Sequence, residues 1–165
     1  MRKLRKMVFL LAVGIVAIGL SNGKDAVAGE QEKAAFVRYI NENLSDPVKY
    51  PYAEYGFYDI NKDGTMEMFF QYEYGQRGAC KVYKYRKSNG KVIKMAEMNG
   101  INGVSKYPQE KAIVKIYSGG ADDTKADIYS MKNGKLVKGA TKDLTDDRNY
   151  WIHELEQIEY PNKLY

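Results

Sequence analysis

Apolar residues near the start of the chain recur at helical spacing. Between Glu30 and Leu44 they fall three or four positions apart, with charged residues such as Glu32 and Lys33 around them. This spacing predicts an amphipathic helix over residues 30–44 with one face for the core. Pro47 ends it, because the residue before a proline is disfavoured in the helical region. The apolar positions are Phe36, Val37, Ile40 and Leu44.

From Tyr52 onward the pattern changes to a period of two, which predicts β-strands. Segment 66–74 has one apolar face, and its other face is polar apart from Phe69. We therefore expect a strand with one packed side and one largely solvated side. The apolar face comprises Met66, Met68, Phe70, Tyr72 and Tyr74, and the polar face comprises Glu67, Gln71 and Glu73.

Further strands are predicted over residues 80–86, 91–98, 111–117, 126–132 and 135–138. Asn89-Gly90 and Asn133-Gly134 each separate a pair of them, and Asn-Gly readily adopts the positive φ angles of hairpin turns. Segments Val82–Lys94 and Asp127–Lys138 share a tyrosine-bearing strand, an Asn-Gly-Lys turn and an aliphatic second strand. This similarity suggests a duplicated hairpin, but two short copies do not establish a repeat architecture.

A second helix is predicted near the C-terminus. Thr145 is a suitable N-cap, Trp151, Leu155 and Ile158 recur at helical spacing, and Pro161 ends the pattern. The predicted fold is therefore α+β. It has an N-terminal helix packed on an antiparallel β-sheet of about five to seven strands, built from hairpins, and a C-terminal helix.

The first 28 residues have the features of an export signal. A basic start precedes an uncharged apolar run of 14 residues from Met7 to Leu20. This is shorter than the about 20 residues of a membrane-spanning helix, which argues against the alternative of an uncleaved anchor. Ala26-Val27-Ala28 supplies the small-x-small pattern that signal peptidase recognises. We expect residues 1–28 to be a cleaved signal peptide and residues 29–165 a single secreted domain without a stable membrane span.

Most of the net positive charge belongs to this signal and not to the domain. Residues 1–28 carry +4 of the chain's net charge of +5, so the high pI does not indicate nucleic-acid binding. The charges in question are those of Arg2, Lys3, Arg5, Lys6 and Lys24 against Asp25. Cys80 is the only cysteine and is predicted to be a small buried apolar residue.

An oxygen-rich loop at residues 59–67 lies between two aromatic runs. Asp59, Asn61 and Asp63 alternate, and Gly64 permits a sharp reversal of the chain. Calcium takes six to eight oxygen ligands from carboxylates, amides and backbone carbonyls. The sequence therefore predicts a calcium site. Its ligands are Asp59, Asn61, Asp63, the backbone carbonyl of Thr65, and Glu67. An EF-hand is excluded, because its closing glutamate would fall at position 70, which is Phe70.

The run Asp59-x-Asn61-x-Asp63-Gly64-x-x-Glu67 resembles the calcium loop of FG-GAP and VCBS repeats, the strand–loop–strand units of integrin-type propellers. Similar loops, followed by a tyrosine-rich strand and an Asn-Gly-Lys hairpin, occur in secreted bacterial proteins. The resemblance covers residues 55–74 and, more weakly, the hairpin that follows. It implies a calcium-stabilised β-hairpin and carries no activity with it.

Two alternatives concern metal binding. The loop at 59–67 could be an ordinary polar turn that binds nothing, since Asp, Asn and Gly dominate turns. Gly119, Asp122, Asp123 and Asp127 could form a second, degenerate site, but they lack the alternation of the first loop. We interpret this second group as a solvated turn.

No catalytic motif is present, and the chain is predicted not to be an enzyme. A Cys80/His153 nucleophilic pair has no supporting local motif, and His153 is expected on the solvated side of the last helix. Segment Lys81–Lys87 interleaves basic and aromatic residues, as polyanion-binding surfaces do. The outward face of an amphipathic strand explains that pattern better.

The expected function is a secreted, non-catalytic calcium-binding module, specifically a bacterial extracellular or cell-surface binding protein. Its expected partners are a glycan, an anionic wall polymer or a protein, and not nucleic acid. The alternative is an extracellular protein-interaction module, such as an inhibitor or immunity partner, in which calcium is purely structural.

Overall fold

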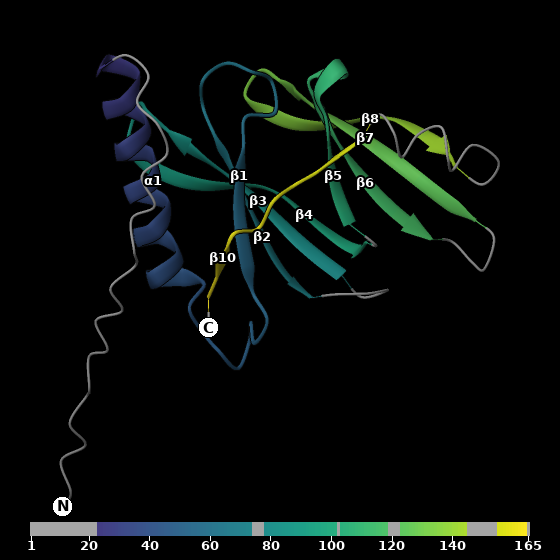
Figure 1. The fold of residues 1–165 in the computed structure, drawn as a ribbon, viewed down its shortest axis with the longest axis horizontal. Coiled ribbons are helices and arrows are strands. Elements are labelled where there is room, and N and C mark those ends of the chain that lie inside the picture. Colours follow the sequence, from purple (N-terminus) through teal and green to yellow (C-terminus); the bar gives the residue numbers. More distant parts are fainter. Residues whose placement is uncertain (1–22, 74–77, 102, 119–122, 145–154, 165) are drawn as a thin grey trace, which may run out of the picture.

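The computed structural model describes residues 23–73, 78–101, 103–118, 123–144 and 155–164. Within these ranges, one α-helix and ten strands form three layers: the helix, a first sheet and a second sheet (Figure 1). All neighbouring strands are antiparallel. The α+β prediction is confirmed at this level, with most of the described residues in strands.

The strands divide into two five-stranded sheets, whereas the sequence predicted one sheet of five to seven strands. In spatial order, sheet A contains β10 (Asn162–Lys163), β1 (Glu54–Tyr58), β2 (Glu67–Glu73), β3 (Gly78–Arg86) and β4 (Lys91–Ile101). Sheet B contains β8 (Lys135–Asp143), β7 (Thr124–Lys132), β6 (Ala112–Ser118), β5 (Gly103–Tyr107) and β9 (Glu156–Gln157). A 3₁₀ turn, η2 (Pro108–Glu110), joins β5 to β6.

Each sheet is a four-stranded meander with one strand of the C-terminal segment added beside its first strand. The two similar hairpins in the sequence are the third and fourth strands of each meander, β3–β4 and β7–β8. Their Asn-Gly turns are confirmed, because Gly90 has φ 67°, Asn133 φ 50° and Gly134 φ 69°. The duplication suggested by the sequence therefore corresponds to equivalent positions in the two sheets.

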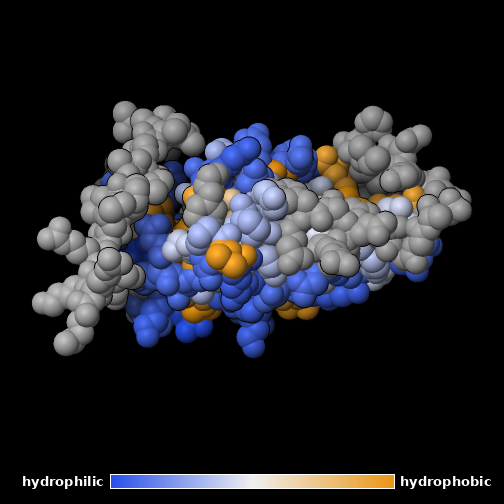
Figure 2. Space-filling view, turned by 90° about the horizontal axis from the view of Figure 1, so that it is seen from below, coloured by the Kyte–Doolittle hydropathy of each residue, from blue (hydrophilic) through white to orange (hydrophobic). Residues whose placement is uncertain are grey.

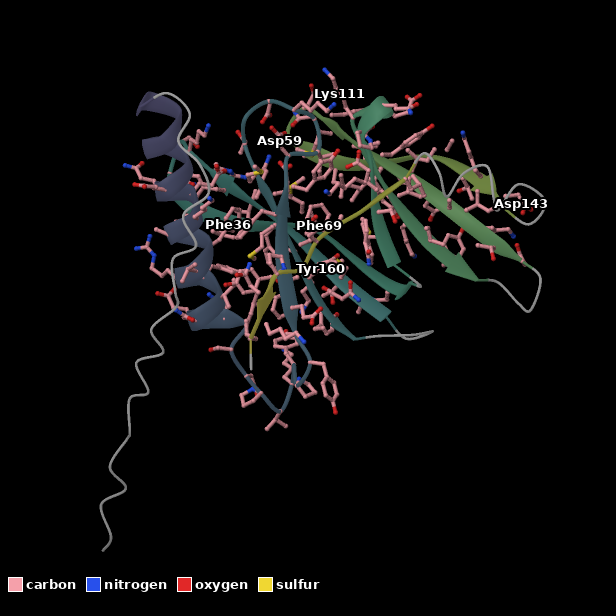
Figure 3. All side chains as sticks on the ribbon, viewed as in Figure 1. Phe36, Asp59, Phe69, Lys111, Asp143 and Tyr160 are labelled. Atoms are coloured by element: carbon pink, nitrogen blue, oxygen red, sulfur yellow. The ribbon has the colours of Figure 1, made fainter. Side chains whose placement is uncertain are left out.

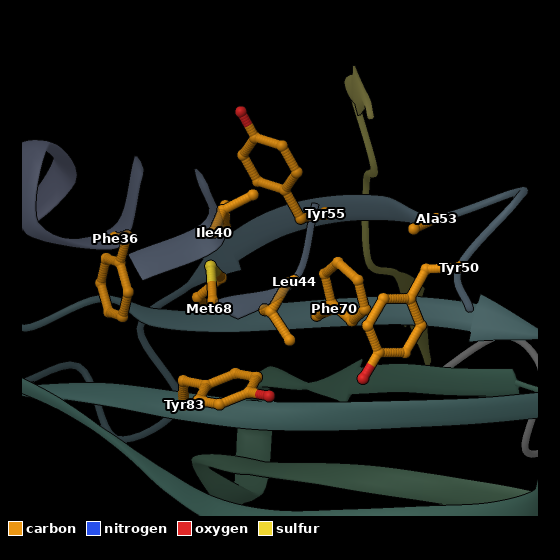
Figure 4. Close-up of a cluster of buried hydrophobic side chains, with 9 residues drawn as sticks. All are labelled: Phe36, Ile40, Leu44, Tyr50, Ala53, Tyr55, Met68, Phe70 and Tyr83. Carbon is orange, nitrogen blue, oxygen red and sulfur yellow. The ribbon is translucent and has the colours of Figure 1, made fainter. Parts of the chain in front are cut away.

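Helix α1 (Gly23–Asn43) covers one face of sheet A. It includes most of the predicted helix and begins earlier, at Gly23, before the expected cleavage point. Its apolar stripe packs on β1, β2 and β3 in a cluster that we call the helix-side core (Figure 4). The buried members are Phe36, Ile40, Leu44, Tyr50, Ala53, Tyr55, Met68, Phe70 and Tyr83. After the helix, the Asp46 carboxylate accepts hydrogen bonds from the backbone N–H of Val48 and of Lys49, which turns the chain towards β1.

The opposite face of sheet A packs against sheet B in a second cluster, the inter-sheet core. The prediction that this face of β2 is largely solvated is therefore wrong, because Phe69 is fully buried there. Period-two patterning could not show that a second sheet covers this face. The buried members are Ile60, Phe69, Cys80, Val82, Met98, Val104, Ile113 and Ile158.

The predicted C-terminal helix is not found where the structure describes its segment. Residues 145–154, which include Thr145, Trp151 and His153, lie outside the described ranges. Beyond them the chain is extended: β9 pairs with β5, and Ile158 enters the inter-sheet core. Burial of Ile158 and pairing of β9 with β5 therefore replace the helical pattern in residues 155–160.

The tail crosses β1 at Gly56 before β10 pairs with Glu54 and Tyr55. A Cβ atom at position 56 would overlap the backbone carbonyl of Glu159. Glycine is therefore required here for close backbone approach and not for an unusual φ angle. Among the described residues, no helix is both long and apolar enough to cross a membrane.

We predict that Gly56→Ala lowers the free energy of unfolding by about 1–3 kcal/mol, because the methyl group must displace the tail. Gly103→Ala is the matched control, since a Cβ there meets nothing within 4 Å, and its effect should stay within about 0.5 kcal/mol. Urea titration of both variants measures this. Equal stabilities for the two variants would contradict the placement of the tail.

Candidate metal centre

The loop of residues 59–66 joins β1 to β2 and is closed by the pair Tyr58–Glu67. Figure 3 shows Asp59 in this loop, at the same end of the molecule as Lys111 after η2. Ile60 anchors the loop, because its side chain is fully buried in the inter-sheet core. The loop therefore has a fixed position relative to both sheets.

The backbone of the loop curls around the side chains of two aspartates. Lys62 has φ 58° and Gly64 has φ 82°, both in the left-handed region. The Asp59 carboxylate accepts hydrogen bonds from the backbone N–H of Asp63 (3.1 Å) and of Gly64 (2.7 Å). Asp63 in turn accepts one from the backbone N–H of Thr65 (2.8 Å). The predicted reversal at Gly64 is thus present, with both carboxylates drawn into the turn.

Asn61 lies between these aspartates, with one polar atom satisfied and one not. Its Nδ2 donates a hydrogen bond to Asp63 Oδ2 at 2.9 Å. Its Oδ1 is buried and has no hydrogen-bond partner. Burial raises the pKa of Asp63, but hydrogen bonds from Asn61 and Thr65 outweigh it and hold that pKa below the usual value. Asp63 is therefore an ionised group beside a free amide oxygen.

Glu67 brings a further carboxylate to the base of the loop. Its side chain is only 2% exposed, and its Oε2 accepts a hydrogen bond from the backbone N–H of Ile60 at 3.1 Å. Burial, which is the largest cause, and the charges of Asp63, Asp59 and Glu32 together raise the pKa of Glu67 to about 7, against the lowering effect of that hydrogen bond. A carboxylate here is costly when ionised, unless a positive charge compensates it.

One carboxylate near this loop, that of Glu32 on α1, was not predicted from the sequence. Glu32 is only 3% exposed, and its Oε1 has no hydrogen-bond partner. Burial raises its pKa, as do the charges of Asp63 and Asp59, while Lys87 and the backbone N–H of Met66 oppose them. The sequence feature that could have identified it is its spacing, because Glu32 lies four positions before Phe36 and so falls on the buried stripe of the helix.

These residues fit calcium by their chemistry, because all the donors are oxygens. The loop supplies Asp59, Asn61, Asp63 and Glu67 from one turn, with a buried amide oxygen that has no other partner. In the described ranges, no group of three or more His, Cys, Asp and Glu side chains is assembled closely enough to hold a metal ion. The aspartates instead accept hydrogen bonds from the loop backbone. The carbonyl of Thr65 as a ligand stays a prediction.

The second candidate group does not gather around one centre in the described residues. Asp123 forms an ion pair with Lys125 at 3.1 Å, whereas positions 119 and 122 lie outside the described ranges. Asp127 was expected in a solvated turn, but it is buried in β7. Its carboxylate accepts hydrogen bonds from Thr141 (2.7 Å) and Tyr117 (3.3 Å) and forms an ion pair with Lys138 (2.8 Å).

Neither Cys80 nor the basic segment after it forms a site. Cys80 is fully buried, as predicted, and burial raises the pKa of its thiol to about 12. Lys81 is 9% exposed; its Nζ donates to the Tyr50 hydroxyl (2.9 Å) and lies 4.5 Å from the centre of the Tyr72 ring. Tyr83 is buried in the helix-side core. The expectation of an outward-facing strand is therefore wrong for Lys81 and Tyr83, because packing covers them.

Comparison with known proteins adds no relative to this picture. No family model matches the chain, and no match was found among curated proteins or solved structures. Function is therefore inferred from the site itself.

Replacing Asp127 by Asn should lower the free energy of unfolding by about 1–3 kcal/mol, because the buried carboxylate loses its charge and its ion pair with the exposed Lys138. The Asp127 pKa is held below its ordinary 3.8: burial raises it, and Lys138, Thr141 and Tyr117 lower it more. The stabilisation is therefore complete above pH 3.8 and is lost as the pH falls through the lower folded-state pKa. Urea titrations at pH 6 and pH 2.5 test this. A variant equally destabilised at both pH values would contradict it.

In chelator at pH 8, the free energy of unfolding of Glu67→Gln should be about 1–3 kcal/mol higher than that of the parent. The substitution removes a buried negative charge that no cation compensates under these conditions. The gap should close as the pH falls from about 7 towards 4.5, where the folded parent also binds a proton. Glu156→Gln, at an exposed glutamate of β9, is the control and should change little. A destabilised Glu67→Gln at pH 8 would show that the charge is already compensated.

Proposed function

We propose that this protein is a secreted, non-catalytic calcium-binding module of a bacterial cell surface or extracellular space. The site is the β1–β2 loop, with ligands from Asp59, Asn61, Asp63, Thr65 and Glu67. The observation that carries the proposal is the buried Oδ1 of Asn61, which has no hydrogen-bond partner and belongs to the same turn as Asp59 and Asp63. The oxygen pattern that resembles FG-GAP and VCBS loops supports the choice of ion.

The proposed role of the ion is to stabilise the fold. The site lies at the junction of β1, β2 and the inter-sheet core, since Ile60 and Glu67 of the same loop are both buried. A ligand at 100 times its dissociation constant adds about 2.7 kcal/mol to the free energy of unfolding. This is a large share of the 5–15 kcal/mol that a domain has. Extracellular calcium-binding modules typically have dissociation constants of about 10⁻⁴–10⁻³ M.

Absence of catalysis is part of the proposal. The thiol of Cys80, a candidate nucleophile, is fully buried, and its raised pKa keeps it protonated. Export through a signal peptide over residues 1–28 belongs to the proposal as well, on the evidence of the sequence alone.

The partner surface is best sought away from Tyr83 and Lys81, which are buried. The face in Figure 2 is largely hydrophilic, with small separated hydrophobic areas. In the loop before β1, Val48 is 90% exposed and Tyr52 is 73% exposed. These two side chains favour the second candidate, a protein-interaction module with structural calcium, over the binding of an anionic wall polymer or glycan through segment 81–87.

Thermal unfolding with calcium and with chelator tests the proposed site. Calcium in about hundredfold excess over its dissociation constant should raise the Tm by roughly 5–10 °C, and Asp59→Asn should abolish most of that increase. Asp123→Asn, at an aspartate outside the loop, is the control and should keep the full increase. Equal Tm values in calcium and chelator, with no heat on calorimetric titration, would show that the loop is only a polar turn.

A further inference from the structure

Helix α1 contributes a buried acid to the same region as the β1–β2 loop. Glu32 lies on the stripe of the helix that faces sheet A, four residues before Phe36 of the helix-side core. The backbone N–H of Met66, at the end of the loop, lies against its carboxylate. Helix and loop are therefore in contact through a charged side chain and not only through apolar packing.

The Glu32 carboxylate has an oxygen left over for a ligand. Its Oε1 is buried without a hydrogen-bond partner, although the side chain is only 3% exposed. A buried carboxylate oxygen in that state normally has a cation or a donor beside it. Lys87 acts on Glu32 only as a charge; among the salt bridges between described residues, none involves Glu32.

The other charges that face Glu32 are repulsive. Asp59 and Asp63 of the loop, and Glu67 at the start of β2, all act electrostatically on the same region. In the described residues these carboxylates are not close enough to hold an ion as they stand, but like charges on two neighbouring elements still repel each other, and Lys87 is the positive charge that opposes this effect at Glu32. A divalent cation turns this repulsion into attraction, because each carboxylate can then act as a ligand.

We propose that Glu32 is an additional carboxylate ligand of the ion held by the β1–β2 loop, so that calcium fastens α1 to sheet A. The inference rests on the proposed calcium site and extends it to a segment outside the loop motif. Calcium then controls the docking of the helix. Without the ion, the packing of Phe36 and the apolar residues after it holds the helix on sheet A. The buried charge of Glu32 then opposes the docking of the helical turn before Phe36.

Calorimetric titration of calcium into the purified parent and Glu32→Gln measures the contribution of this side chain. Loss of even an outer partner at a metal site costs about 10–100-fold in affinity, so Glu32→Gln should weaken binding at least about tenfold. Glu30→Gln, at an exposed position on the same helix, is the control and should bind like the parent. Both variants should melt in chelator at or above the Tm of the parent, which shows that they are folded.

Hydrogen exchange gives the readout that is specific to helix docking. In the parent and in Glu30→Gln, calcium should slow exchange of the amides of residues 30–36, and in Glu32→Gln this slowing should be lost. Unchanged affinity of Glu32→Gln, or equal slowing in all three proteins, would overturn the inference while leaving the loop site intact. A Tm of Glu32→Gln below the parent's in chelator would overturn it too, because Glu32 would then stabilise the metal-free fold directly. If the parent takes up no calcium, the loop site fails, and this inference fails with it.

Discussion

A carboxylate that folding removes from water must be compensated by its surroundings, and this constraint centres on Glu67. Its side chain is almost fully buried where the loop enters β2, and it accepts a hydrogen bond from Ile60, a residue of the inter-sheet core. Asp59 and Asp63 add negative charge to the same place. A cation bound there would relieve desolvation and repulsion together, which connects the stability of both sheets to the occupancy of one loop.

The architecture explains why the loop can be held so firmly. Sheet A is covered by α1 on one face and by sheet B on the other, and both ends of the loop belong to its strands β1 and β2. In sheet B the corresponding connection, between β5 and β6, is the short turn η2, which contains Pro108 and Glu110 but no aspartate. The two meanders therefore share strand order, while only the first carries the oxygen-rich loop.

The local features were predictable, because they depend on neighbours in the chain. The amphipathic helix, the Asn-Gly turns and the reversal at Gly64 all follow from residue spacing and turn chemistry. Tertiary packing decided the rest. A second sheet buries Phe69, and the tail forms strands of two residues, too short to leave a pattern. The role of Glu32 also could not be predicted from the sequence. A single acid on the apolar stripe of a helix has identifiable neighbours only once the helix is packed on the sheet.

The most direct measurement is terbium luminescence excited through tyrosine, because energy transfer requires the bound ion to lie close to a tyrosine ring. Tyr58 borders the loop and pairs with Glu67, so an ion held by the loop would lie near it. We predict that terbium emission rises to saturation at one ion per chain, that calcium displaces it, and that Tyr58→Phe reduces it. Absence of sensitised emission, or emission that calcium does not displace, would contradict a calcium site at the β1–β2 loop.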